Sequence, residues 1–381
     1  MTEEFISSTH PPLPPTTEED RFSWLRLLRS RRVGPATFHR LLREHGTAQN
    51  ALAALPEVAR HAGVEDYEIC PAGVIEAELK AAKAVKAQLL CLGSPEYPAA
   101  LAEIEDAPPL LWAIGNVDLA NRPAIGMVGA RNASSLGTRM ARALARELSE
   151  AGFVIVSGLA HGIDAAAHLT ALGGGTIAVM AGGVDVIYPR ENQQLGEDIA
   201  RLGLCLSEQS MGMAPKSRHF PARNRIISGM SRGLVVVEAA TKSGSLITAQ
   251  NALDQGREVL AVPGHPFDAR ASGCNMLIRD GAVLVRNASD VIDVIGPAEN
   301  QTPEPEQPAL PFEPPPPRRS LRETALLHQD ILNRLGPSPL AEDQLIRDLT
   351  TTAGEIAPAL VELELDGKIE RRAGGLLTRL S

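Results

Sequence analysis

The sequence predicts an α/β protein with a doubly wound, Rossmann-like parallel sheet, a small helical domain before it and a winged helix after it. Three observations predict this architecture. Between residues 123 and 295, strand-like apolar runs alternate with amphipathic helical patterns, which is typical of a parallel sheet covered on both faces. Residues 21–90 show helical periodicity, and a proline-rich stretch separates the sheet from further helical patterns near the C-terminus.

The N-terminal part is predicted to be helical after a disordered tail. Residues 1–20 are polar and proline-rich, which is typical of disorder. Apolar residues then recur at helical spacing, and Val33-Gly34-Pro35 breaks two helices as in SAM-like or helix-hairpin-helix domains. Helical signals continue over Leu52–Ala62 and Ala72–Leu89. Residues 21–90 are therefore expected to form a small packing domain, although helix-hairpin-helix units can also contact a DNA backbone.

The sheet domain is predicted to span residues 97–296. After an irregular connector, Leu110–Ile114 is expected to form one edge strand. Right-handed crossovers then give an open, doubly wound sheet. The predicted parallel strands are Ala124–Gly129, Phe153–Ser157, Thr176–Ala181, Gly203–Ser207, Gly233–Glu238, Glu258–Val262 and Ala282–Val285. The predicted helices between them are Gly137–Glu150, Ile163–Leu172, Asn192–Arg201, Ala222–Met230, Leu246–Gln255 and Cys274–Asp280.

The C-terminal part is predicted to be a winged helix, residues 321–381, joined by an extended linker, residues 297–320. Its three helical patterns precede a basic segment and a Gly374-Gly375 turn. The third pattern carries glutamates and no Lys or Arg, so it would repel phosphates. We therefore expect a packing or protein-contact module, while the basic residues of the wing leave a DNA role open. The three helices are Thr324–Leu335, Glu342–Leu349 and Ala353–Leu365, and the basic wing residues are Lys368, Arg371 and Arg372.

The composition indicates a globular cytoplasmic protein. The chain has 381 residues and a formal net charge of -9, so any binding of anions must be local. Its 4 cysteines are scattered and form no C-x-x-C spacing, which argues against zinc sites and disulfides. The sequence shows neither a signal peptide nor an apolar run of about 20 residues, so no contact with a membrane is expected.

Ligands bind to doubly wound sheets in the turns beyond the carboxyl ends of the strands. The first such turn follows a buried strand, passes through Gly129 and enters a helix that begins near Ser135. It offers backbone N–H groups and the positive end of a helix dipole to an anion. Arg131 adds a full charge and a planar donor fork. The other predicted turns are Ser157–Gly162, Ala181–Tyr188, Glu208–Arg225, Glu238–Ser245 and Pro263–Gly273.

A nucleotide cofactor is not expected in the first turn. A dinucleotide fingerprint requires G-x-G-x-x-G and an acidic residue at the end of the second strand. Gly126, Gly129 and Gly137 have the wrong spacing, and the second strand ends at Ser157-Gly158 without an acid. The sequence also has no Walker-type phosphate loop, so neither a cofactor nor ATP hydrolysis is predicted.

Two basic windows without any acidic residue point to a polyanion instead. The first window lies between residues 119 and 146, and the second between residues 209 and 237. Both windows begin at the ligand-binding edge of the sheet. We expect anion binding by the cations in or next to the turns, and helix or sheet coverage by those on the first helix. The former are Arg131, Lys216, Arg223 and Arg225, and the latter are Arg139, Arg142 and Arg146.

Phe220 lies inside the second window, flanked by His219 and Pro221. A basic loop with an aromatic residue suits a single strand of nucleic acid, because phosphates take the charge and a base stacks on the ring. A loop anchor that packs on the sheet is the alternative for Phe220. Two further turns, Lys242–Thr248 and Ser157–Asp164, have small residues and hydroxyls that suit phosphate. His161, Asp164 and His168 are better explained by helix capping and packing than by a metal site.

Several long motifs resemble one protein family. They are Gly126-Met-Val-Gly-Ala-Arg131, Val156-Ser-Gly-Leu-Ala-His-Gly-Ile-Asp164, Gly182-Gly-Val-Asp-Val-Ile-Tyr-Pro189, His219-Phe-Pro-Ala-Arg-Asn-Arg-Ile-Ile-Ser-Gly229, Ser243-Gly-Ser-Leu-Ile-Thr-Ala249 and Gly273-Cys-Asn-Met-Leu-Ile278. Over about residues 97–295 the chain resembles the DNA-processing protein A family, also called DprA or Smf. The resemblance implies a protein without catalytic residues that binds and protects incoming single-stranded DNA during natural transformation.

The resemblance further implies a homodimer joined through the sheet domain and a second partner, the recombinase RecA, which the family helps to load onto DNA. It assigns DNA contacts to the first turn and to the Lys216–Arg225 loop, and the small residues and hydroxyls of the Lys242–Ser245 turn add a third segment. The predicted DNA-binding residues are Gly129, Ala130, Arg131, Ser134, Lys216, Phe220, Arg223, Asn224, Arg225, Lys242, Ser243, Gly244 and Ser245. The alternative is a nucleotide-phosphate hydrolase related to lysine-decarboxylase-like proteins. Those carry a Pro-Gly-Gly-x-Gly-Thr loop near a catalytic Glu, where this chain has Ser243-Gly-Ser245 near Glu238.

Overall fold

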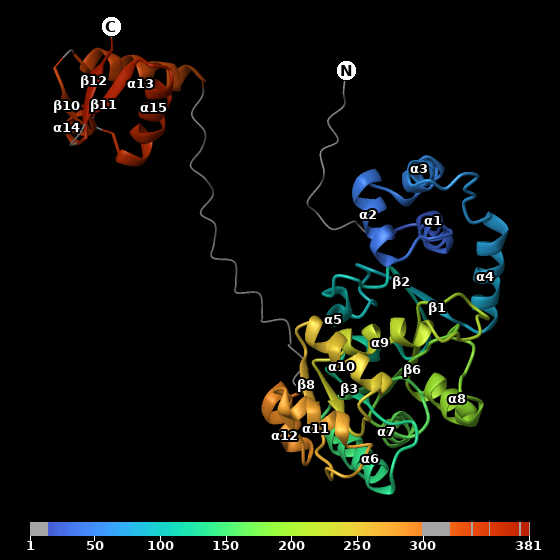
Figure 1. Ribbon diagram of the computed structural model, residues 1–381. Coiled ribbons are helices and arrows are strands. Elements are labelled where there is room, and N and C mark those ends of the chain that lie inside the picture. Colours follow the sequence, from blue (N-terminus) through green and yellow to red (C-terminus); the bar gives the residue numbers. More distant parts are fainter. Residues whose placement is uncertain (1–13, 299–320, 337, 350, 373–374, 381) are drawn as a thin grey trace. The chain divides into compact units, whose positions relative to one another are not determined.

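The computed structural model describes residues 14–298, 321–336, 338–349, 351–372 and 375–380. It divides into two compact units, Met1–Gln301 and Thr302–Ser381, and each unit is described by itself (Figure 1). Residues 1–13 of the predicted tail and 299–320 of the predicted linker lie outside the described residues. In the part of the chain that is described, no helix is both long enough and apolar enough to cross a membrane.

The first unit is built on one mixed sheet with the strand order β1-β2-β6-β5-β4-β3-β7-β8-β9. All seven predicted parallel strands are confirmed. They form the part of the sheet with the order β6-β5-β4-β3-β7-β8-β9, in which every neighbouring pair is parallel. The first two strands are antiparallel additions at the β6 side. The strands are β1 (Gln88–Cys91), β2 (Leu110–Gly115), β3 (Ala124–Val128), β4 (Val154–Ser157), β5 (Thr176–Val179), β6 (Leu204–Ser207), β7 (Gly233–Val236), β8 (Glu258–Ala261) and β9 (Val283–Leu284).

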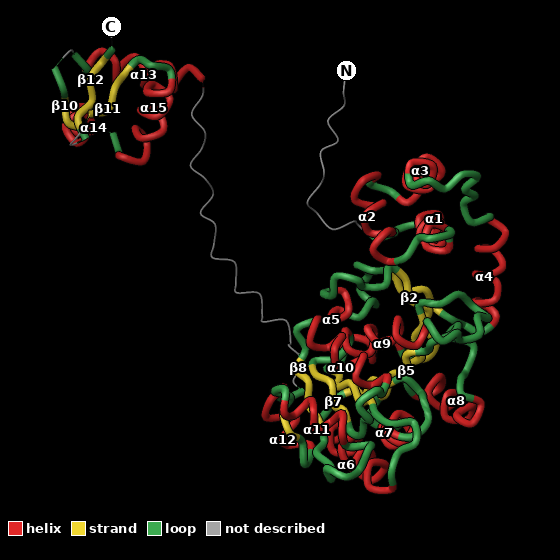
Figure 2. The backbone as a smooth tube through the Cα atoms, viewed as in Figure 1, coloured by secondary structure: helices red, strands yellow, loops and turns green. Residues whose placement is uncertain are grey.

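Helices cover both faces of this sheet, as predicted (Figure 2). Ile125 and Met127 of β3 pack against α6, α7 and α12, whereas Ala124 and Val128 belong to the opposite core with α9 and α10. Successive side chains of a strand point to opposite faces, so a strand covered on both sides appears in the sequence as a continuous apolar run. The helices are α5 (Ala99–Ala102), α6 (Ser135–Glu150), α7 (Ile163–Ala171), α8 (Gln193–Leu202), α9 (His219–Gly229), α10 (Gly244–Asp254), α11 (Ser272–Arg279), α12 (Ala288–Ile295) and the 3-10 turns Val117–Asn121 and Arg190–Asn192.

Two predictions near the start of the sheet are wrong. The helical signal was expected to run to Leu89, but α4 ends at Ala84 and Lys86 adopts a left-handed backbone with φ of 57°. The following residues form β1, whose Leu90 and Cys91 are buried. β1 pairs with β2, so Leu110–Ile114 lies within the sheet and not at its edge. A short apolar run does not by itself distinguish a helix end from a strand.

The N-terminal helices form the predicted helical domain: α1 (Glu18–Arg29), α2 (Pro35–His45), α3 (Ala48–His61) and α4 (Ala72–Ala84). The first helix begins inside the predicted tail, because Thr17 and Asp20 form a capping box. Buried Glu78 of α4 pairs with Arg29 at 2.8 Å and accepts a hydrogen bond from the Trp112 indole of β2 at 2.8 Å. The ion pair joins α1 to α4, and the hydrogen bond from Trp112 anchors the helical domain on the sheet.

The second unit is the predicted winged helix. Its core includes Ile331, Leu345, Leu360 and Leu377. Each basic residue of the wing lies close to an acid: Arg371 to Glu342 at 2.5 Å, Arg372 to Glu370 at 3.2 Å and Lys368 to Asp366 at 2.9 Å. These pairs reduce the charge available to DNA. The elements are α13 (Leu321–Arg334), β10 (Leu340–Ala341), α14 (Glu342–Asp348), α15 (Ala353–Leu365), β11 (Ile369–Arg372) and β12 (Leu376–Arg379), with strand order β10-β12-β11.

Candidate nucleic-acid interface

The topological switch point of the sheet lies between β3 and β7. These strands are parallel neighbours, but the chain leaves β3 toward β4 and leaves β7 toward β8. The two connections therefore diverge and leave a crevice beyond the carboxyl ends of both strands, where doubly wound sheets bind their ligands. The first predicted turn, Gly129–Ser135, and the turn Glu238–Ser245 meet at this crevice.

A cavity of about 480 Å³ occupies the crevice and brings together three segments that the sequence analysis selected. We call it the switch-point pocket. Ser134, Lys216 and Arg225 are predicted site residues that do not line it. Among the predicted site residues, those that line it are Gly129, Ala130, Arg131, Phe220, Arg223, Asn224, Lys242, Ser243, Gly244 and Ser245.

Arg131 and Phe220 form the centre of the switch-point pocket. The guanidinium of Arg131 lies over the Phe220 ring, with 5.3 Å between its carbon and the ring centroid. Arg131 is exposed, and no acidic side chain in the described residues pairs with it. The attraction between a cation and a ring face stabilises such an exposed site by about 0.5–1 kcal/mol. The N–H groups of the guanidinium remain available to a ligand. Phe220 is half-buried, so part of its ring stays open to a ligand.

Tyr188 extends this stack and was missed by the sequence analysis. Its ring centroid lies 5.8 Å from that of Phe220 with the planes tilted by 59°, and Tyr188 is 50% exposed. The position was recognisable, because Tyr188 ends a turn at the ligand-binding edge and the chain has only 3 tyrosines. Arg270 also lines the pocket and was not selected; it lies in the turn after β8 and is bonded to Asp268.

The N-terminus of α10 provides the second anion-binding feature. Ser243 caps the helix, and its hydroxyl lies 2.5 Å from that of Ser245. A Cβ added to Gly244 would meet no atom within 4 Å, so the first turn of the helix faces open space. Exposed Lys242 lies directly before it. The N–H groups of Ser245 and Leu246 donate to Ser243, so an anion here meets the Gly244 N–H, the positive end of the dipole and a lysine charge.

The N-terminus of α6 is different, because a carboxylate of the protein already occupies it. Glu238 accepts hydrogen bonds from the backbone N–H of Ser134 at 2.8 Å and from the Ser134 hydroxyl. A side chain at Gly137 would collide with the same carboxylate. Ser134 is thus bonded to Glu238, and its contact with DNA stays a prediction. The first turn presents Arg131 to a ligand, while the helix dipole is neutralised internally.

Arg223 lines the pocket but is mostly buried, and its contact with DNA stays a prediction. It is only 5% exposed, and its guanidinium donates to the carbonyl oxygens of Gly158, at 2.8 Å, and Val179. The pKa of Arg223 is lowered to about 10, mainly by burial; the charge of buried Asp164 opposes this shift and the charge of Arg131 adds to it. Asp164 in turn accepts from the N–H groups of Gly158 and Ala160. Arg223 thus ties the turns behind the pocket together and is not a free phosphate ligand.

Arg225 is likewise committed to other groups of the protein. It lies 3.0 Å from Asp106 and 2.7 Å from Glu208, and both acids come from outside the basic window. A direct phosphate contact by Arg225 is therefore not supported. Lys216 is exposed and no acid in the described residues pairs with it, but it lies outside the pocket lining. Its contact with DNA stays a prediction.

The histidine and aspartate cluster behind the pocket is explained by hydrogen bonding. His168 Nε2 accepts from the Leu159 N–H at 3.3 Å, and Nδ1 lies 2.7 Å from the Thr176 hydroxyl, which itself donates to the Ile155 carbonyl. Burial, with the nearby Arg223 charge, lowers the pKa of His168 to about 3. Within the described part of the chain, no group of three or more His, Cys, Asp or Glu side chains is placed to hold a metal.

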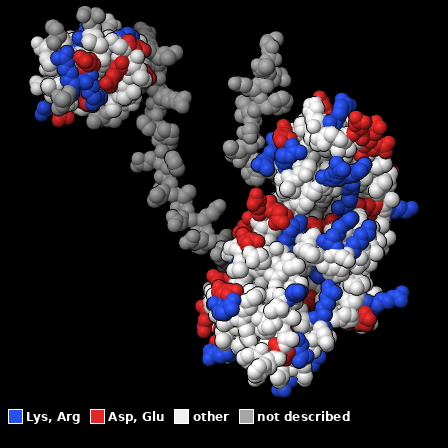
Figure 3. All heavy atoms as spheres, viewed as in Figure 1, with Lys and Arg blue, Asp and Glu red and all other residues white. Residues whose placement is uncertain are grey.

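The positive charge that the switch-point pocket offers to a ligand comes from a few local side chains. Figure 3 shows basic and acidic side chains mixed over the drawn face of the first unit, with no broad basic surface. The cations free to meet a phosphate at the switch-point pocket are Arg131 and Lys242. These lie beside the aromatic pair of Phe220 and Tyr188.

Comparison with known proteins shows what kind of chain carries this pocket. A family model described as DNA recombination-mediator protein A matches residues 88–296, which include the sheet and the switch-point pocket. The chain belongs to the DNA recombination-mediator protein A family. Models described as a DprA-like N-terminal HHH domain and a DprA winged helix domain match residues 18–81 and 314–375.

Relatives within the DprA family cover most of the chain. Protein Smf of Synechocystis is 33% identical over 394 residues, covering 92% of this chain and 96% of the relative. The DNA processing protein DprA of Streptococcus pneumoniae is 48% identical over 198 residues, covering 51% of this chain and 70% of the relative. The X-ray structure of the S. pneumoniae protein covers 71% of this chain and 97% of its own, with 38% identity and a TM-score of 0.61.

One further solved structure concerns a ligand. The structure of DprA from Helicobacter pylori is described as giving insight into the single-stranded DNA binding mode of that protein. It is 30% identical to this chain, covers 55% of this chain and 95% of its own, and has a TM-score of 0.51.

Proposed function

We propose that this protein binds single-stranded DNA without sequence preference in the switch-point pocket. The observation that carries the proposal is the stack of Arg131 on Phe220 beside Tyr188, placed next to the open N-terminus of α10. Phosphates fit Arg131, Lys242 and the Gly244 N–H at the start of α10, while bases fit the aromatic rings. Every base has a π-face, so stacking of this kind is tolerant of sequence. The ligand named for the H. pylori relative supports the same assignment.

We further propose that bound DNA is protected and that the protein helps to load RecA onto it, as a homodimer in the cytoplasm. These roles rest on membership of the DprA family and on the resemblance of its motifs. They require no catalytic residue and no cofactor. A strand whose phosphates and bases lie in the pocket is covered there by protein, which is a physical basis for its protection from nucleases.

The salt dependence of DNA binding tests the proposal. With phosphates on Arg131, Lys242 and Lys216, the log–log slope for an oligothymidylate should be roughly -2, since each phosphate on a single strand contributes about 0.7. Replacing Arg131 by Gln should weaken binding and reduce the slope by about 0.7. Arg201→Gln is a matched control, because this arginine is exposed on α8 and paired with Asp198. Fluorescence anisotropy at several salt concentrations is the measurement, and salt-independent binding would contradict the proposal.

The alternative function, hydrolysis of a nucleotide phosphate, needs a free general base near the turn at residue 243. Glu238 is the nearest candidate, but its oxygens accept hydrogen bonds from the backbone and hydroxyl of Ser134. We therefore expect no release of base or phosphate from AMP-type substrates. Chromatographic detection of such release, lost on Glu238→Gln, would favour the hydrolase.

A further inference from the structure

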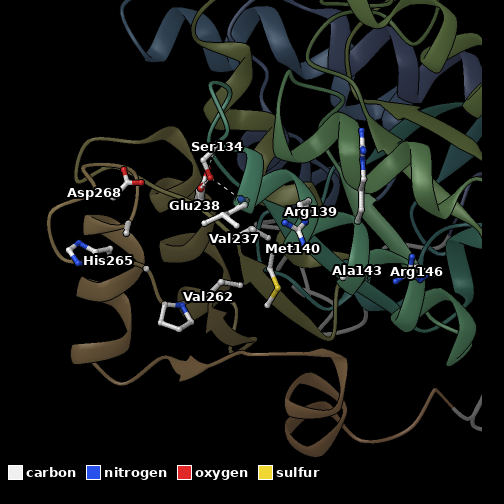
Figure 4. A pocket seen from close by; sticks show the side chains of 16 residues that line it. Ser134, Arg139, Met140, Ala143, Arg146, Val237, Glu238, Val262, His265 and Asp268 are labelled. Atoms are coloured by element: carbon white, nitrogen blue, oxygen red, sulfur yellow. Dashed lines mark hydrogen bonds between the residues drawn. The ribbon is translucent and has the colours of Figure 1, made fainter.

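A second pocket lies on the other side of the first turn, between α6 and the loop that follows β8. It encloses about 720 Å³. Figure 4 shows its two sides: α6 with Arg139, Met140 and Arg146, and the loop with His265 and Asp268. We call it the α6 pocket. None of the predicted functions uses it, apart from the Ser134–Glu238 contact at its inner end.

Three arginines of α6 line this pocket: Arg139, Arg142 and Arg146. Their spacing of three and four residues places them on one face of the helix, about 10 Å apart from first to last. All three are exposed, and no acid in the described residues forms an ion pair with them. The expectation that they only cover the helix and the sheet is therefore incomplete, because their charges remain available.

The acids of the α6 pocket are bonded to other groups and form no ion pair with these arginines. Glu238 is bonded to Ser134, and Asp268 is bonded to Arg270 at 3.1 Å. Hydrogen bonding to Arg270 lowers the pKa of Asp268 below its ordinary value. Of the charged residues that line the pocket, the remaining three are the arginines of α6.

An exposed aromatic pair lies on the same loop. Phe267 is 95% exposed, and its ring centroid lies 5.6 Å from that of His265, which lines the pocket. An isolated exposed apolar residue is normal on a protein surface. A fully exposed Phe stacked on a His beside three unpaired arginines, however, repeats the composition of the switch-point pocket. Charge with an adjacent ring is what binding of a single strand requires.

The two pockets are neighbours. Arg270 lines the switch-point pocket and Asp268 lines the α6 pocket, and these two side chains are bonded to each other. On the opposite side, Asn132 lines the first pocket and Ser134 the second, two residues further along the same turn. A strand that leaves the switch-point pocket over this turn therefore reaches the α6 pocket without crossing another element.

We propose that the α6 pocket is a second subsite for the same single strand, with phosphates on Arg139, Arg142 and Arg146 and a base on Phe267. The proposal rests on the proposed function, which assigns the first subsite to single-stranded DNA. It predicts that the footprint of the protein on DNA is longer than the switch-point pocket alone.

The test compares a short and a long oligothymidylate, of about 5 and about 15 nucleotides, in anisotropy titrations with the full chain. The variant Arg142→Gln/Arg146→Gln should lose about tenfold in affinity for the long strand, with a salt slope smaller by about 1.4, and keep its affinity for the short one. Phe267→Ala should show a similar loss for the long strand, while Phe267→Tyr keeps the ring and the affinity. The control Arg40→Gln/Arg201→Gln removes two exposed charges elsewhere and should change neither titration.

The possible outcomes separate this proposal from the function on which it rests. If the wild-type protein binds neither strand, the proposed function fails. If it binds both, and the α6 and Phe267 variants bind the long strand as tightly as wild type, the second subsite is overturned. An equal loss on short and long strands also overturns it. If light scattering shows that the variants differ from wild type in molecular mass in solution while their binding of the long strand is unchanged, the α6 pocket belongs to an interface between copies. The proposal is then wrong.

Discussion

Removal of the Phe220 ring should weaken DNA binding without changing its dependence on salt. In Phe220→Ala the pocket loses a stacking surface, and Arg131 loses the ring face that holds its guanidinium at 5.3 Å. Stacking of a base on an aromatic side chain contributes about 1–3 kcal/mol. Because Phe220 is half-buried, we expect a value near the lower end, about 1.4 kcal/mol, which is a tenfold weaker Kd.

The salt slope distinguishes stacking from charge. Phe220→Ala leaves the number of phosphates in contact with the protein unchanged, so its slope should equal that of wild type, whereas Arg131→Gln should reduce the slope by about 0.7. Anisotropy titrations of an oligothymidylate at several salt concentrations measure both quantities. Phe220→Trp keeps a ring and should retain most of the affinity.

Tyr188→Ala provides a second comparison. If the rings of Tyr188 and Phe220 stack on bases of one strand, the variant Tyr188→Ala/Phe220→Ala should lose less binding free energy than the sum of the two single losses. The reason is that the two rings are neighbours, with 5.8 Å between their centroids. Unchanged affinity in Phe220→Ala would refute the reasoning, because the ring would then be only a loop anchor. A loss accompanied by a smaller slope would show that the ring acts by positioning Arg131.

Three further predictions concern the groups behind the pocket. Ser134→Ala and Glu238→Ala should each lower the free energy of unfolding by about 1–3 kcal/mol. The sum of these two losses should exceed the loss in the double variant, because the two residues share the same hydrogen bonds. Additive losses in urea unfolding would contradict the contact. Arg223→Met should destabilise the fold by roughly 2–4 kcal/mol, since it leaves the Gly158 and Val179 carbonyls and Asp164 without their cation. Arg131→Gln should change the stability little. Equal urea midpoints for the two variants would show that Arg223 is not a structural cation. His168, whose pKa is lowered to about 3, stays neutral in the folded state while it gains a proton in the unfolded state below about pH 6.5, so its contribution to stability is full above that pH and is lost as the pH falls toward 3. The drop in urea midpoint between pH 7 and pH 5 should therefore be smaller in His168→Gln than in wild type, and identical drops would exclude the buried histidine as its source.

The sheet was predictable because its evidence is local. Each parallel strand is buried on both faces, so β3 appears as the continuous apolar run Ala124–Val128 whatever its neighbours are. The switch-point turns were also recognisable, since turns that follow parallel strands lie at one edge of the sheet. β1 was missed, because four residues at the end of a helical pattern become a strand only by pairing with β2.

The candidate site could be located in the sequence, but the contacts of its side chains could not. Basic windows and an isolated aromatic residue are visible in the chain, and Arg131, Phe220 and Lys242 do meet at one pocket. Tyr188 and Phe267 lie outside the basic windows, so the charge argument did not select them. The ring contact between Tyr188 and Phe220 joins distant segments, so it appears only when folding places those segments next to each other.

By itself the sequence determined the α/β class, the edge of the sheet that carries the candidate site, and the kind of ligand that a basic turn with an aromatic residue favours. Only the tertiary structure decided which charges are free. Arg225 is neutralised by Asp106 and Glu208, and the dipole of α6 by Glu238, all of them acids beyond the windows in which those groups were found. The availability of a charge depends on burial and on partners brought close by folding, and spacing along the chain does not encode either of them.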